Sequence, residues 1–276
     1  MEKTTDMVTW NSFIWFGVPS VLLSAAAAVV SMCADDHWSQ SSLRYRRRRT
    51  IAISLSSASL AVMAAFIIGL WIGLDRPPLR TMGETRLWYS FFAIFAGLFT
   101  YLRWRYRWIL SFSTVLAAVF VVINICRPEI HDQTLMPALQ SPWFIPHVTV
   151  YMFSYSFLGC AFLLAVAGLF TSKNNIMQAA DTLVYIGMAF LTFGMLSGAL
   201  WAKEVWGHYW SWDPKETWAL VTWLSYMLYI HLRLLGRGSR KALCLLLIFS
   251  FLCLQMCWWG VNYLPSAQDS IHVYNR

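Results

Sequence analysis

Aromatic and polar side chains are mixed in one thirteen-residue stretch of this chain, residues 206–218. Five of its positions are tryptophan or tyrosine, and it lies between two long apolar runs. The stretch is too polar to cross lipid and too aromatic for an ordinary loop, so we predict an amphipathic platform at the membrane–water boundary. Flat rings there can hold a flat ligand. The residues that we expect to bind a cofactor are Trp206, Gly207, Tyr209, Trp210, Trp212, Asp213 and Trp218.

Two histidines could supply iron ligands beside this platform. His147 begins an apolar run after an aromatic, proline-containing stretch, and His272 lies in the C-terminal tail. Two imidazoles that flank an aromatic floor are the ligand set of a six-coordinate haem iron. Each histidine alone is better explained as a solvated surface residue. The haem interpretation therefore depends on the pair together with the tryptophans between them.

A third histidine, His231, lies near the end of an apolar run and two residues before Arg233. An ionisable group inside a membrane span is costly and marks a candidate functional site. We therefore consider His231 a candidate functional residue within the membrane. The alternative is an interfacial histidine that reaches the lipid headgroups beside Arg233.

The end of the platform carries a helix start signal. Asp213 takes the N-cap position, Pro214 the first helical position and Glu216 the third, which together form a capping box. This pattern predicts a helix that begins at residue 214. We also expect Asp213 to position the aromatic floor, without its charge having to touch a ligand.

Composition identifies the chain as a membrane protein. Of its 276 residues, 58% are hydrophobic and 12% charged, and the mean hydropathy is +0.53. A soluble fold could not cover so much apolar surface. The net charge of +8 is explained by positively charged cytoplasmic loops, so no nucleic-acid partner is expected. The six cysteines include no CxxC pair, which excludes a dithiol oxidoreductase and a c-type cytochrome.

The apolar runs predict an all-α polytopic membrane protein with about eight transmembrane helices in a single domain, residues 1–276. The predicted spans lie near 10–33, 51–74, 87–102, 108–126, 147–170, 181–201, 217–235 and 242–260. The outer haem-binding segment, residues 202–218, includes the platform and lies between the sixth and seventh predicted spans. Two GxxxG patterns, at Gly69 and Gly73 and at Gly194 and Gly198, suggest close helix packing.

Charge sets the orientation of these spans. The loops 34–50, 103–107, 171–180 and 233–241 share one side and hold thirteen of the 21 basic residues. We expect this side to be cytoplasmic. The platform, His147, His272 and both termini then lie outside.

The platform sequence resembles the tryptophan-rich signature of haem-handling proteins of the CcsA/ResC family, which serves system II cytochrome c biogenesis. Matching positions are Trp206, Gly207, Tyr209, Trp210, Trp212, Asp213, Pro214, Lys215, Glu216 and Thr217. The regions around His147, around His231 and before His272 are also similar. The resemblance covers about residues 80–276.

The resemblance implies a function. The chain would export haem b and, with a CcsB/ResB-type membrane partner, present it for thioether attachment to the CxxCH of an apocytochrome c. It would then be part of a haem lyase complex that also uses a thioredoxin-like thiol reductant. His147 and His272 would be axial ligands of an outer haem, and His231 would bind a membrane haem. Any second ligand of that membrane haem would come from a partner chain or be lacking. The expected location is a bacterial inner membrane, with the outer haem on the periplasmic face, although plastid membranes also host the family.

Two other classes of function remain open. A haem chaperone similar to the CcmC proteins would bind haem and pass it to a separate ligase, although the Asp-Pro-Lys-Glu-Thr ending of the platform favours CcsA. An electron-transferring b-type cytochrome would need several histidine pairs at matching depths within the spans. Only His231 clearly lies in a predicted span, which disfavours the cytochrome.

Overall fold

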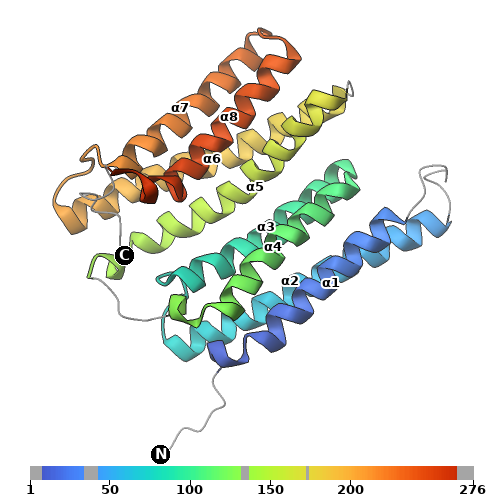
Figure 1. Ribbon diagram of the computed structural model, residues 1–276, viewed down its shortest axis with the longest axis horizontal. Coiled ribbons are helices and arrows are strands. Elements are labelled where there is room, and N and C mark those ends of the chain that lie inside the picture. The colour runs from blue at the N-terminus through green and yellow to red at the C-terminus, as the bar shows by residue number, and fades with distance from the viewer. Residues whose placement is uncertain (1–7, 34–42, 132–136, 172–173, 266–276) are drawn as a thin grey trace, which may run out of the picture. The chain divides into compact units, whose positions relative to one another are not determined.

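The structure is a computed structural model that describes residues 8–33, 43–131, 137–171 and 174–265. All regular elements of these residues are helical (Figure 1), which confirms the predicted all-α class. The eight α-helices are α1 (Ile14–Met32), α2 (Leu43–Leu74), α3 (Met82–Trp104), α4 (Arg107–Cys126), α5 (Phe144–Phe170), α6 (Asn174–Trp206), α7 (Pro214–Leu234) and α8 (Arg240–Trp258). The short 3-10 helices are η1 (Trp10–Ser12), η2 (Pro128–His131), η3 (Pro137–Gln140) and η4 (Gly260–Tyr263).

Six of the described helices are long and apolar enough to cross a membrane, namely α1, α2, α4, α5, α6 and α8. This finding identifies a polytopic membrane protein. Helices α3 and α7 are not among the six. Both contain charged residues near their ends together with tryptophan and tyrosine, which lower the mean hydropathy. That they also cross the membrane stays a prediction.

Most helices begin a few residues before the predicted apolar runs, and the difference is largest for α2 and α6. Helix α2 begins at Leu43 rather than near residue 51, so the arginines from Arg44 to Arg49 lie on a helix and not in a loop. Arginine is a good helix former, and a helix can continue past the hydrocarbon into water. Helix α6 runs from Asn174 to Trp206 and therefore includes residues 202–206, which the sequence placed in the segment between two helices.

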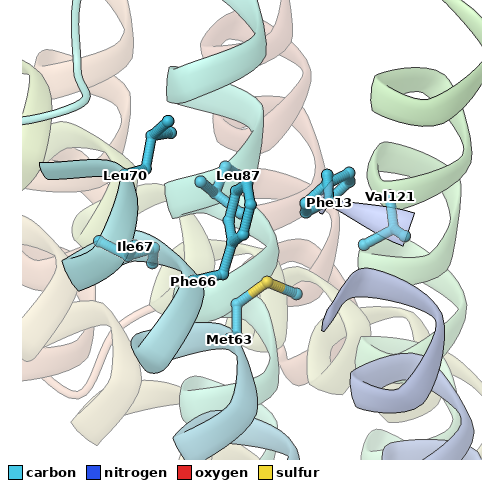
Figure 2. Packing of buried hydrophobic residues seen from close by; sticks show 7 residues of the cluster. All are labelled: Phe13, Met63, Phe66, Ile67, Leu70, Leu87 and Val121. Carbon is cyan, nitrogen blue, oxygen red and sulfur yellow. The ribbon is translucent and has the colours of Figure 1, made fainter. Parts of the chain in front are cut away.

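The chain forms two compact units, Met1–Thr134 with α1 to α4 and Leu135–Arg276 with α5 to α8. The single transmembrane domain stays a prediction. In the first unit, seven buried side chains from the start of α1 and from α2, α3 and α4 form one core (Figure 2), and they are Phe13, Met63, Phe66, Ile67, Leu70, Leu87 and Val121. Hydroxyl contacts add to this packing, with Ser20 bonded to Ser59 at 2.9 Å and Ser24 to Thr114 at 2.6 Å.

In the second unit, glycines of α6 receive side chains of α5. A Cβ added to Gly194 would lie 2.5 Å from the ring of Tyr151, and one added to Gly198 would lie 2.6 Å from the ring of His147. The predicted close packing at this GxxxG pattern is therefore confirmed. Gly69, from the other pattern, lies instead against Val8, in the segment before η1.

Candidate functional site

The platform is a sharp connection between α6 and α7. Helix α6 ends at Trp206, and Gly207 then adopts a φ of 83°, which a residue with a side chain would rarely adopt. The amide of Gly207 donates to the carbonyl of Lys203 at 3.1 Å, and Trp212 also has a positive φ, of 61°. A left-handed conformation is uncommon for a bulky residue and indicates that its surroundings hold it in place.

The predicted capping box is confirmed and also holds the platform. Asp213 accepts a hydrogen bond from the amide of Lys215 at 2.9 Å, and it is only 7% exposed. Glu216 reaches back and accepts from the amides of Ser211 at 2.7 Å and Asp213 at 3.2 Å, and from the Ser211 hydroxyl at 3.2 Å. These bonds fix the backbone on both sides of Trp212.

The rings of the platform lie at the surface. Tyr209 is 55% exposed and Trp212 is 67% exposed. Trp210 is half-buried and meets Trp212 edge to face, with ring centroids 5.9 Å apart. The ammonium of Lys203 lies 5.5 Å from the centre of the Tyr209 ring. Trp218 lies further along, on α7, and is half-buried.

His147 lies in the first turn of α5 with a defined tautomer. Its Nδ1 is 2.8 Å from the carbonyl oxygen of Gly194. A carbonyl can only accept, so Nδ1 donates, and a neutral ring then carries its lone pair on Nε2. Metal-binding histidines commonly use this arrangement, with the other ring nitrogen donating to a backbone carbonyl.

A row of aromatic contacts links His147 to the platform. The centroids of His147 and Trp201 are 5.5 Å apart, and those of Trp201 and Trp206 are 4.9 Å apart. Trp201 is 3% exposed, and its indole donates to the carbonyl of Ala138 at 2.8 Å. The sequence reasoning missed Trp201, although it lies only five residues before the signature. A tryptophan in an apolar run gives no signal that separates it from the packing residues around it.

His231 is distant from the platform and faces away from the helices of its unit. It is exposed, and its Nδ1 lies 2.8 Å from the carbonyl oxygen of Met227. By the same reasoning, a neutral ring carries its lone pair on Nε2. His231 lies about 25 Å along α7 from Pro214, because an α-helix rises about 1.5 Å per residue. One haem at the platform could not use both His147 and His231.

Next to His231, Arg233 forms a salt bridge with Asp181 of α6, and Tyr229 donates to the same carboxylate at 2.7 Å. This network fixes α7 against α6 near the histidine. His272, the other predicted axial ligand, lies outside the described residues. Its pairing with His147 therefore stays a prediction.

The described residues fit a haem group. Exposed rings offer a flat apolar surface, and His147 has the tautomer of an iron ligand. The indole Nε1 of Trp210 is buried and has no hydrogen-bond partner in the described part of the chain. A ligand with an acceptor atom at the platform would satisfy it.

Fold and site together define a helical membrane protein with an aromatic, histidine-flanked platform. The model of the cytochrome c assembly protein family matches residues 37–267 of the chain. The chain therefore belongs to this family, and its role lies in cytochrome c biogenesis.

Individual relatives agree with this assignment. The cytochrome c biogenesis protein CcsA of Chlorella vulgaris is 30% identical over 266 residues, covering 79% of this chain and 84% of that protein. CcsA of Cuscuta exaltata is 35% identical and covers 70% of this chain and 75% of its own length. CcsA of Chlamydomonas reinhardtii is 37% identical over 175 residues, which cover 59% of this chain and 50% of that protein.

Proposed function

We propose that this chain exports haem b and holds it on the outer face of the membrane, where a CcsB/ResB-type partner completes a haem lyase complex. The observation that carries the proposal is the connection of His147, through Trp201, to the signature tryptophans. His147 and His272 would hold the iron, and Trp206, Gly207, Tyr209, Trp210, Trp212, Asp213 and Trp218 would form the platform.

Each part of this unit has a distinct task in the proposal. When bound, haem supplies the vinyl groups to which the CxxCH thiols of an apocytochrome c add. The Gly194 carbonyl holds the Nε2 lone pair of His147 ready for the iron. Glu216 keeps Trp212 and its neighbours in one arrangement, so that a flat ligand is presented in one orientation. The chain then acts chiefly by positioning, while the cofactor supplies the reactive groups.

His231 belongs to a second, membrane-embedded site in this proposal. Its exposure on α7 leaves the ring accessible to a partner, and the Asp181–Arg233 pair holds the helix on which it lies. A second ligand would come from the CcsB/ResB-type protein. The proposed orientation places the platform and both termini outside, in a bacterial inner membrane, with a thioredoxin-like reductant keeping the apocytochrome thiols reduced.

Co-expression tests the proposal. The chain, its partner and an apocytochrome c with one CxxCH are produced together, and covalent haem is measured on denaturing gels by its peroxidase activity. We expect His147→Ala and His272→Ala to lose most of the product. His208→Ala is a matched control, because His208 is an exposed histidine of the same platform. If haem is bound but never attached by the wild type with its partner, the chain is a haem chaperone instead.

A further inference from the structure

The first turn of α5 carries His147 and needs support from outside the helix. In the described part of the chain, the N-cap residue Trp143 makes no side-chain hydrogen bond to the helix, and Pro146 in the first turn has no amide hydrogen. The first amides of a helix have no partner within it, so a first turn without a cap opens easily. The position of His147 therefore depends on the residues that hold this turn in place.

Ser141, two residues before the N-cap, supplies this support. Its hydroxyl oxygen accepts from the amide of Trp143 at 3.2 Å, and its carbonyl accepts from the amide of Phe144 at 3.2 Å. The amide of His147 then donates to the carbonyl of Trp143 at 3.2 Å. Ser141 is 6% exposed, so these bonds are shielded from water. A continuous series of hydrogen bonds thus leads from Ser141 through Trp143 to the backbone of His147.

Glu204, in the last turn of α6, holds Ser141. The hydroxyl of Ser141 donates to Oε2 of Glu204 at 2.7 Å. A hydrogen bond to a carboxylate is roughly twice as strong as one between neutral groups. It also directs the hydroxyl hydrogen toward Glu204, which leaves the lone pairs of the oxygen for the amide of Trp143. One carboxylate on α6 therefore fixes both the place and the orientation of the group that caps α5.

The same end of α6 also contacts the platform. Trp201 lies three residues before Glu204 and hence on the same side of the helix. Its ring touches those of His147 and Trp206, and its indole donates to the carbonyl of Ala138 in the segment before α5. The last two turns of α6 thus contact the segment before α5, the ring of His147 and the first residue of the platform.

We propose that Ser141 and Glu204 are positioning residues for the iron ligand, an inference that rests on the proposed haem site. Their hydrogen bond joins the end of α6 to the start of α5 and so sets the place of His147 relative to the platform. Neither side chain has to touch the haem. A ligand that is held in place in advance binds the iron without the cost of ordering it. Loss of this bond should therefore weaken the hold on haem through His147.

The test measures haem release from the full chain purified with its partner. Haem is transferred to an excess of apomyoglobin, and its arrival is followed by absorption. We expect Ser141→Ala and Glu204→Ala to release haem about tenfold faster, the order expected for loss of one hydrogen bond to a charged group. Glu204→Gln should stay near the wild-type rate, because its amide oxygen can accept the same bond.

A matched control separates positioning from a general loss of packing. Ser154, seven residues after His147 on α5, donates to the carbonyl of Gly187 on α6 at 2.7 Å and is also buried. Ser154→Ala therefore breaks another serine hydrogen bond between the same two helices. We expect it to release haem at the wild-type rate. Equal acceleration in Ser154→Ala and Ser141→Ala would overturn the proposal.

A double-mutant cycle tests whether Ser141 acts through His147. In the His147→Gly background, Ser141→Ala should add no further acceleration, because the ligand that it positions is gone. An equal effect of Ser141→Ala with and without His147 would overturn the proposal. Faster release from His147→Gly, with wild-type rates in Ser141→Ala and Glu204→Ala, would refute this inference alone. A wild-type rate in His147→Gly would refute the proposed haem site as well.

Discussion

The Nδ1 of His147 lies 2.8 Å from the carbonyl oxygen of Gly194, and the same ring rests on the bare backbone of Gly198. The two glycines of one GxxxG pattern thus have separate tasks. Gly194 sets the tautomer of the histidine, and Gly198 gives the ring its place between α5 and α6. This relationship connects helix packing directly to the proposed iron ligand.

The packing of the His147 ring against Gly198 can be tested by adding one methyl group to this glycine. In Gly198→Ala the new Cβ would lie 2.6 Å from two ring atoms of His147, so the ring must move. We expect loss of haem from the purified complex, with destabilisation of about 1–3 kcal/mol from overpacking. Absorption spectra and haem content measure the effect. Gly187→Ala is the control, because the three atoms nearest to its Cβ would all belong to Leu158; equal haem loss in both variants would contradict a specific role for Gly198.

The hydrogen bonds that Glu216 accepts from Ser211 and Asp213 should hold the backbone of the platform in place. Glu216→Ala removes the acceptor for two amides and one hydroxyl, so the backbone of residues 211–213 should open more easily. Hydrogen exchange at these residues should become about tenfold faster or more, since each lost bond is worth about 1 kcal/mol. Exchange within α5 serves as the internal reference. An unchanged exchange rate in residues 211–213 would show that the hydrogen bonds of Glu216 do not hold the platform.

The ion pair between Asp181 and Arg233, near His231, predicts that substitutions of these two residues have coupled effects on stability. Asp181→Asn leaves Arg233 without its anion and Tyr229 with a weaker acceptor, in largely buried surroundings. We expect destabilisation of about 2 kcal/mol or more. The double variant Asp181→Leu with Arg233→Leu should lose less than the sum of the two single variants. Unfolding titrations in mixed detergent measure this, and additive losses would contradict the coupling.

His131 predicts a pH dependence of the first unit. Burial lowers its pKa from the ordinary value of about 6.5, and the carboxylates of Glu84 and Glu129 oppose this shift in part. The unfolded chain therefore binds more protons between the two pKa values, so stability rises with pH in that window. The contribution is fully present above about pH 6.5 and is lost as the pH falls through the folded pKa.

The measurement is the unfolding temperature of the purified chain in phosphate-free buffer. When the pH is lowered from 7 to 5, the unfolding temperature of the wild type should fall further than that of His131→Gln, because glutamine does not titrate. Equal losses in the two proteins would show that His131 does not carry this dependence.

Local signals in the sequence predicted the main parts of the fold. The apolar runs located all eight helices, because a membrane span must be continuously apolar. Asp213, Pro214 and Glu216 predicted the start of α7 at the correct residue, because a capping box depends only on near neighbours. The helix ends at Leu43 and Asn174 were missed, because polar residues can extend a helix beyond the hydrocarbon without any apolar signal.

The contacts of the site were harder to predict because they join distant segments. Trp201 and Gly194 contact His147 only through the packing of α6 on α5, and no local pattern in the sequence encodes that register. In the same way, the ring of His131 lies against the bare backbone of Gly83 only because η2 packs on α3. Residue types therefore indicated the chemistry of the site, but the residues that contact His147 and His131 could be identified only from the folded structure.

The central claim is that His147 binds the iron of a haem held at the platform. Its most direct test is the absorption and electron paramagnetic resonance spectrum of the complex purified with its partner, for His147→Gly with and without added imidazole. We predict that His147→Gly loses the six-coordinate low-spin signal and that imidazole restores it, while His208→Ala keeps the wild-type spectrum. A wild-type spectrum in His147→Gly without imidazole would contradict the account.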